Sequence, residues 1–153
     1  MTISRRHGFV AFACVVACVV LVGCGGKEKR ATEKEMVANA SSYAEAVVRQ
    51  DRPAALAASV PGYSADFDLE MFKRLGINRV DGAWVDCPDD PLTPLPDGPC
   101  FGFDVIGRPV PSDVPGQSII YSGTLSVVVS PSSGLVIGSG YLGASQGVET
   151  KSS

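Results

Sequence analysis

Residues 118–142, SIIYSGTLSVVVSPSSGLVIGSGYL, decide the fold because they hold two strand patterns joined by a turn. Leu125, Val127 and Val129 recur at every second position, which is typical of a strand with one face against a core. Turn-forming residues follow, Pro131-Ser132-Ser133-Gly134, and a second β-rich run comes after them. The segment therefore predicts a hairpin with strands over residues 118–130 and 135–142.

Two earlier runs, residues 80–87 and 101–106, are also rich in β-branched and aromatic side chains and predict two more strands. Everything before them has a helical period. Helices first and antiparallel strands afterwards indicate an α+β fold. We expect N-terminal helices packed on a curved antiparallel sheet of about four strands.

The first helix is predicted over residues 32–50, because Thr32 and Glu35 fit a capping box and apolar residues then recur every three or four positions. Asp51 is suited to cap a second, short helix.

A third helix is predicted over residues 67–75, with Asp66 as its cap and Gly76 as the left-handed residue that ends it. We expect Phe72 to contact Ile77 at this ending. The buried side of this helix is predicted to be Phe67, Met71, Phe72 and Leu75.

The N-terminus begins with Arg5 and Arg6, continues with an apolar run over residues 9–22 and ends in the motif Leu21-Val22-Gly23-Cys24. This layout is typical of an export signal, and the motif resembles the lipobox of bacterial lipoprotein signal peptides. The resemblance implies cleavage between Gly23 and Cys24 and a diacylglyceryl group on Cys24. It also implies that the new amino end can carry an acyl chain such as palmitate.

The alternative interpretation is an uncleaved transmembrane anchor. Residues 8–23 would form a helix of roughly 24 Å at about 1.5 Å per residue. A bilayer core of about 30 Å usually needs near 20 residues. A small glycine directly before a cysteine also has no purpose in a simple anchor.

We therefore expect a signal peptide over residues 1–23, a polar tether over 24–31, one α+β domain over 32–145 and a flexible tail over 146–153. The chain has 13 basic and 16 acidic side chains. Arg5 and Arg6 leave with the signal, so the remaining chain has 11 basic and 16 acidic side chains and a formal charge of −5. Nucleic acid binding needs a basic surface, so we expect no nucleic acid partner.

Cys87 and Cys100 are then the remaining pair in an exported domain, where thiols oxidise, and we expect a disulfide between them. They enclose five of the eleven prolines, which favours an extended loop. The loop either presents a recognition surface or simply crosses between two strands of a small secreted domain; we favour the second. Its region contains four aspartates without the spacing of a calcium loop, so we expect no metal site: Asp86, Asp89, Asp90 and Asp97.

The only histidine, His7, also leaves with the signal, so no imidazole remains for catalysis. We predict no catalytic residue and no cofactor, and we do not expect an enzyme. A candidate apolar pocket with one carboxylate consists of Trp84, Phe103, Asp104 and Tyr141, although Asp104 alternates with Phe103 along one strand. The alternative is that the aromatic residues belong to the core and Asp104 to a solvent face.

Residues 43–57, YAEAVVRQDRPAALA, resemble the opening of the cone-shaped nuclear-transport-factor-two-like superfamily, in which a long helix, a polar turn and an alanine-rich helix precede a curved sheet. The order of three helices and then strands over residues 32–142 is similar too. No His or Asp-Arg motif of the superfamily's enzymes can be placed on this chain. Its partner-binding and envelope members are therefore the nearer analogues, and the fold alone names no function.

These observations predict a lipid-anchored envelope lipoprotein on the extracytoplasmic side of the cell membrane. Its domain would bind an envelope protein or another envelope component without catalysis. The alternative is a small-molecule-binding or isomerase-like cone domain that uses the apolar pocket, and a purely structural envelope component is a third possibility.

Overall fold

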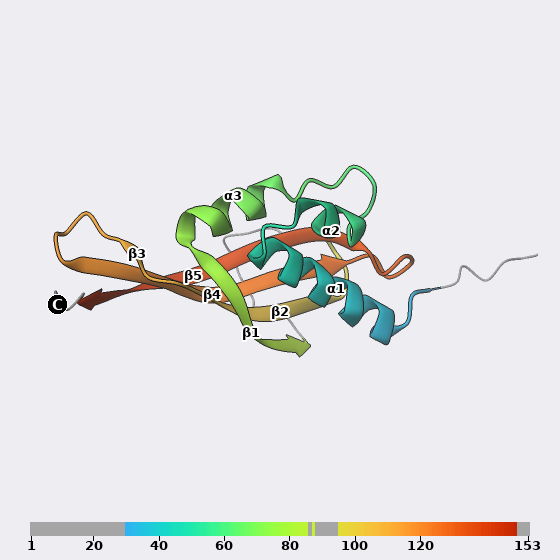
Figure 1. Cartoon of the computed structure of the whole chain (residues 1–153). Coiled ribbons are helices and arrows are strands. Elements are labelled where there is room, and N and C mark those ends of the chain that lie inside the picture. The colour runs from blue at the N-terminus through green and yellow to red at the C-terminus, as the bar shows by residue number, and fades with distance from the viewer. Residues whose placement is uncertain (1–29, 86, 88–94, 150–153) are drawn as a thin grey trace, which may run out of the picture.

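The computed structural model describes residues 30–85, 87 and 95–149, and it leaves the side chains of residues 84, 85 and 149 undescribed. Within these residues, three helices lie on one face of a five-stranded antiparallel sheet (Figure 1). The chain is thus an α+β protein, as predicted. Its elements, in order, are α1 (Glu33–Val48), α2 (Arg52–Ala57), α3 (Asp66–Leu75), β1 (Ile77–Val85), β2 (Cys100–Gly107), β3 (Val110–Pro111), β4 (Gln117–Val129) and β5 (Val136–Glu149).

The two predicted helix starts at Thr32 and Asp51 are confirmed. The Thr32 backbone N–H donates to the Glu35 carboxylate at 2.8 Å, and the Glu35 N–H donates back to the Thr32 hydroxyl at 3.3 Å. The Asp51 carboxylate accepts from the Ala54 N–H at 3.1 Å. These bonds satisfy backbone donors that have no partner inside the helix.

Helix α3 ends as predicted, because Gly76 has a φ of 67° and donates its N–H to the Phe72 and Lys73 carbonyls. Phe72 and Ile77 are both buried in the core. The start of α3 differs, since the helix begins at Asp66 and its N-cap, Ala65, makes no side-chain hydrogen bond. The prediction that Asp66 caps this helix is wrong, because its carboxylate pairs instead with the Arg52 guanidinium at 2.7 Å.

The buried side of α3 also differs from the prediction. Phe67 is 76% exposed, whereas Asp68, Leu69 and Phe72 are buried. The helix therefore turns Asp68 toward α1, where the hydroxyl of Tyr43 donates to it.

The strands form a meander in which β2 and β3 pair with one edge of β4, and β5 pairs with the other. Phe103 of β2 lies opposite Leu125 of β4, which lies opposite Tyr141 of β5. Two features differ from the prediction of about four strands with a loose C-terminal tail. The two-residue strand β3 makes the fifth, and β5 continues to Glu149, which pairs with Gln117.

The core lies between the helices and the sheet and is filled by side chains from both layers. Its largest buried members are one tyrosine and three phenylalanines: Tyr43 of α1, Phe72 of α3, and Phe101 and Phe103 of β2. Gly123 of β4 and Gly143 of β5 lie directly opposite each other, and the ring of Tyr141 lies over both. A Cβ atom at either glycine would collide with this ring. Covering paired glycines with a neighbouring aromatic ring is a known way to stabilise a sheet.

The predicted disulfide is present, with the Cα atoms of Cys87 and Cys100 5.4 Å apart. The described part of the proline-rich loop, residues 95–99, packs on the sheet face opposite the helices. A Cβ built on Gly138 of β5 would lie 2.5 Å from the Pro96 ring, and one on Gly98 would lie 3.0 Å from Val128 of β4. The loop segment therefore covers part of the second sheet face.

Replacing Gly138 with alanine tests this packing. The new methyl would overlap the Pro96 ring, so we expect a loss of about 1–3 kcal/mol in the free energy of unfolding. Pro96→Ala removes that ring and should reduce the loss in the double variant. Urea unfolding of the two single variants and the double variant measures the coupling; additive losses would mean that Pro96 does not pack on Gly138.

Candidate functional site

The four residues of the predicted pocket do not meet in one cavity. Phe103 is buried on the helix-facing side of the sheet, while Asp104, the next residue of the same strand, faces the other side. There the Thr124 hydroxyl donates to the Asp104 carboxylate at 3.4 Å. The Trp84 backbone pairs with Gly102, but its side chain lies outside the described residues.

Tyr141 is a packed residue. Its ring meets Phe72 edge-on with centroids 5.4 Å apart, and its hydroxyl donates to the Ser122 carbonyl at 3.0 Å. Burial raises the pKa of its hydroxyl above the usual range, with Tyr121 as a second cause. Phe103 and Tyr141 thus belong to the packed side of the sheet, and Asp104 belongs to the other.

The structure contains a polar cluster that the sequence did not predict, consisting of Tyr43, Tyr63, Asp68 and Ser139; we call it the Asp68 cluster. Asp68 is 3% exposed, and its Oδ2 accepts from the Tyr43 hydroxyl at 2.6 Å and from the Ser139 hydroxyl at 2.5 Å. Tyr63 and Ser139 share a further hydrogen bond of 2.6 Å. The cluster joins α1, α3, β5 and the segment between α2 and α3.

The cluster keeps its polar groups satisfied in the core. Among the described residues, no buried side-chain nitrogen or oxygen lacks a partner. Asp68 also lies in the first turn of α3, where the helix dipole favours a negative charge. With two hydroxyl donors on its carboxylate, Asp68 is suited to holding the helices on the sheet rather than to transferring protons.

Burial raises the pKa of the Tyr43 hydroxyl far above its usual range, and the nearby Asp68 charge raises it further. Burial also raises the pKa of Tyr63. Both phenols therefore stay protonated in the folded chain at pH values where an unfolded tyrosine ionises.

Stability should consequently fall in alkali. A group with a raised pKa in the folded state stabilises the fold fully below its unfolded pKa, about 10 for tyrosine, and that contribution is lost as the pH rises beyond it. We expect the urea midpoint to drop progressively above about pH 10, and less steeply for Tyr43→Phe. Parallel pH profiles for wild type and variant would contradict this prediction.

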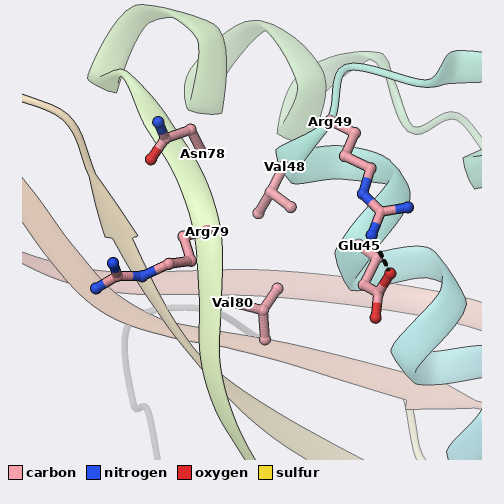
Figure 2. Close-up of a pocket in the computed structure, with 6 residues that line it drawn as sticks. All are labelled: Glu45, Val48, Arg49, Asn78, Arg79 and Val80. Atoms are coloured by element: carbon pink, nitrogen blue, oxygen red, sulfur yellow. Dashed lines mark ion pairs between the residues drawn. The ribbon is translucent and has the colours of Figure 1, made fainter.

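A shallow hollow lies between the C-terminal half of α1 and the start of β1 (Figure 2). Its volume is about 200 Å³, below the roughly 300–1,000 Å³ of typical small-molecule pockets. Arg49 pairs with Glu45 at 2.8 Å, and Arg79 pairs with Asp81 at 2.6 Å and extends away from α1. The two arginines are thus already compensated by neighbours and do not form an anion site. Six residues line the hollow: Glu45, Val48, Arg49, Asn78, Arg79 and Val80.

In the part of the chain that the structure describes, no three His, Cys, Asp or Glu side chains come together as a metal site. Of the four aspartates considered for calcium, Asp97 is exposed, and the other three lie outside the described residues. The described helices include none that is both long enough and apolar enough to span a bilayer. Cys24 and the cleavage site before it also lie outside the described residues.

Comparisons with protein-family models, with curated proteins and with solved structures found no significant match for this chain.

Proposed function

We propose that this chain is a lipid-anchored envelope lipoprotein whose domain, on the extracytoplasmic side of the cell membrane, binds an envelope component without catalysis. The observation that carries the proposal is the motif Leu21-Val22-Gly23-Cys24 at the end of a short apolar run with a basic start. A diacylglyceryl group contributes about 0.8 kcal/mol per buried CH₂, so two or more chains hold a protein firmly on a membrane.

The Cys87–Cys100 disulfide supports the extracytoplasmic location independently of the motif. Structural disulfides persist in oxidising compartments and are rare in the cytosol, where thiols are kept reduced. A covalent link is also useful in a small domain, because a small domain buries a smaller fraction of its surface than a large one and so has a smaller core to stabilise it.

The position of the first described residues is compatible with a tether to a membrane. The Ala31 N–H donates to the Pro131 carbonyl at 3.1 Å, so the chain enters the domain beside the turn between β4 and β5. The seven Cα–Cα steps from Cys24 to Ala31 reach at most about 25 Å. In the proposed arrangement the tether therefore holds the end of the sheet with this turn near the membrane (Figure 1).

The interior of the domain favours binding through its surface over catalysis. Asp68 is the one buried carboxylate among the described residues, and two hydroxyl groups already occupy it. Phe103 and Tyr141 are packed, and Asp104 lies on the other face, so an enclosed ligand pocket is not proposed.

Replacing Cys24 tests the proposal. The full chain is produced in bacteria supplied with a radioactive fatty acid, and we expect wild type to incorporate the label and Cys24→Ala to lose it completely. Cys18→Ala is the matched control, because it makes the same change in the same segment, and it should label like wild type. Equal labelling of Cys24→Ala and wild type, or no labelling of wild type, would refute the lipid anchor.

A further inference from the structure

We propose that the outer edge of β5 is a self-association surface, through which two copies of this chain pair antiparallel about a two-fold axis at Ser145. The proposal concerns residues 141–149 and does not depend on the lipid anchor. It rests on the contrast between the two edges of the sheet and on the self-complementary sequence of β5.

One edge of the sheet is formed by β5, which pairs only with β4 as a strand, and the other by β1 and the two-residue strand β3. Exposed edges invite pairing with other chains, and proteins usually protect them with charges, proline or bulges. Strand β1 has such protection, because its pairing shifts register twice and it contains the exposed ion pair of Arg79 and Asp81.

Strand β5 lacks this protection. Residues 136–148 contain no charged side chain and no proline, and the pairing with β4 runs without a shift from Gly138 to Glu149. A bridge to Ser59 covers the edge at Val136 alone. Within the described residues, no other strand covers this edge from residue 137 onward.

The end of β5 extends beyond the helical layer together with β3 and β4 (Figure 1). Residues 142–148 are all exposed. The body of a second copy, running in the opposite direction, would lie beyond this end, so the helices of the two copies would not collide.

The side chains of β5 select a second copy of the same strand as the occupant. Leu142 and Val148 are 47% and 37% exposed, and both point to the sheet face opposite the helices. When Ser145 faces its own copy, Leu142 of each chain lies directly opposite Val148 of the other. The two-fold axis repeats this pair on its other side, so Leu142 and Val148 of both copies each gain an apolar cross-strand neighbour. No like charges face each other in this register. Registers centred one residue to either side do not bring this pair together.

Cross-linking of the full chain in intact cells tests the arrangement. Residues directly opposite each other in antiparallel strands have Cα atoms about 4.5–5.5 Å apart, within the range of a disulfide or a short bismaleimide. We expect Ser145→Cys to give mostly covalent homodimer. The control Ser132→Cys, an exposed serine in the turn between β4 and β5, should give about tenfold less.

A second pair of variants separates pairing from chance collision. Adding Leu142→Lys to Ser145→Cys places a cation on the edge and should reduce the homodimer about tenfold. The control adds Val114→Lys to Ser145→Cys and should leave the amount of homodimer unchanged. Val114 is also an exposed apolar residue, at 50%, but it lies outside β5. Protease resistance of each variant checks that it is folded.

Equal homodimer from Ser145→Cys and Ser132→Cys would overturn the proposal, even if Leu142→Lys fails to fold. Attachment of Ser145→Cys to a different protein in place of a second copy would overturn it as well. Homodimer that is unaffected by a folded Leu142→Lys variant would show that the pairing does not use this edge.

Discussion

Replacing Asp68 with alanine is expected to lower the free energy of unfolding by about 4 kcal/mol, because it removes a carboxylate that accepts two buried hydrogen bonds, each worth about 1.5–3 kcal/mol. The Tyr43 hydroxyl would remain buried, with the Tyr63 oxygen 3.5 Å away as its nearest partner. The loss would loosen α3, α1 and β5 together, because the Asp68 cluster joins these elements. Urea unfolding followed by circular dichroism measures the change.

Two controls separate the hydrogen bonds from other effects. Asp68→Asn keeps one oxygen that can accept from both hydroxyl groups, so it should cost only about 1–2 kcal/mol. Asp113→Ala removes an exposed carboxylate from the loop before β4 and should change stability by less than about 0.5 kcal/mol. A folded Asp68→Ala variant as stable as Asp113→Ala would show that the cluster does not hold the domain together.

Removing the disulfide is expected to cost about 3 kcal/mol. Cys87 and Cys100 are 13 positions apart, and in the chain-entropy model a loop of this size restricts the unfolded chain by that amount. Without the link, the unfolded chain gains freedom, and residues 95–99 lose one of the restraints that hold them on the sheet.

The variant Cys87→Ser/Cys100→Ser should therefore unfold at a clearly lower urea concentration than wild type. A reducing agent should lower the wild-type midpoint to that of the variant and leave the variant unchanged. A wild-type midpoint that does not respond to full reduction would contradict the stabilising role of the link.

The elements with strong local signals could be predicted from the sequence. The capping residues Thr32 and Asp51 and the left-handed Gly76 each depend on a few neighbouring atoms, and all three are found as expected. The alternation of Leu125, Val127 and Val129 likewise predicted the side of β4 that faces the core, but it did not predict that Ser126 and Val128 on the other side are buried as well. The disulfide could be predicted because only two cysteines remain beyond Cys24.

The features that the sequence did not predict depend on contacts between distant segments. Asp68 is buried because Tyr43 and Ser139, 25 and 71 positions away, supply its donors, and this rotates α3 so that Phe67 faces solvent. The available signal was Asp68 itself, a polar residue on the predicted apolar face of this helix. The C-terminal part of β5 has weak strand propensity, and pairing with the long strand β4 is what keeps it extended.

The measurement that most directly tests the account is the intact mass of the full-length gene product purified from bacterial membranes. We predict a polypeptide that begins at Cys24, carries the added mass of a diacylglyceryl group and further acyl chain, and is two hydrogens lighter from the Cys87–Cys100 bond. An unmodified polypeptide that begins at Met1 would contradict the lipid anchor and with it the proposed location of the domain.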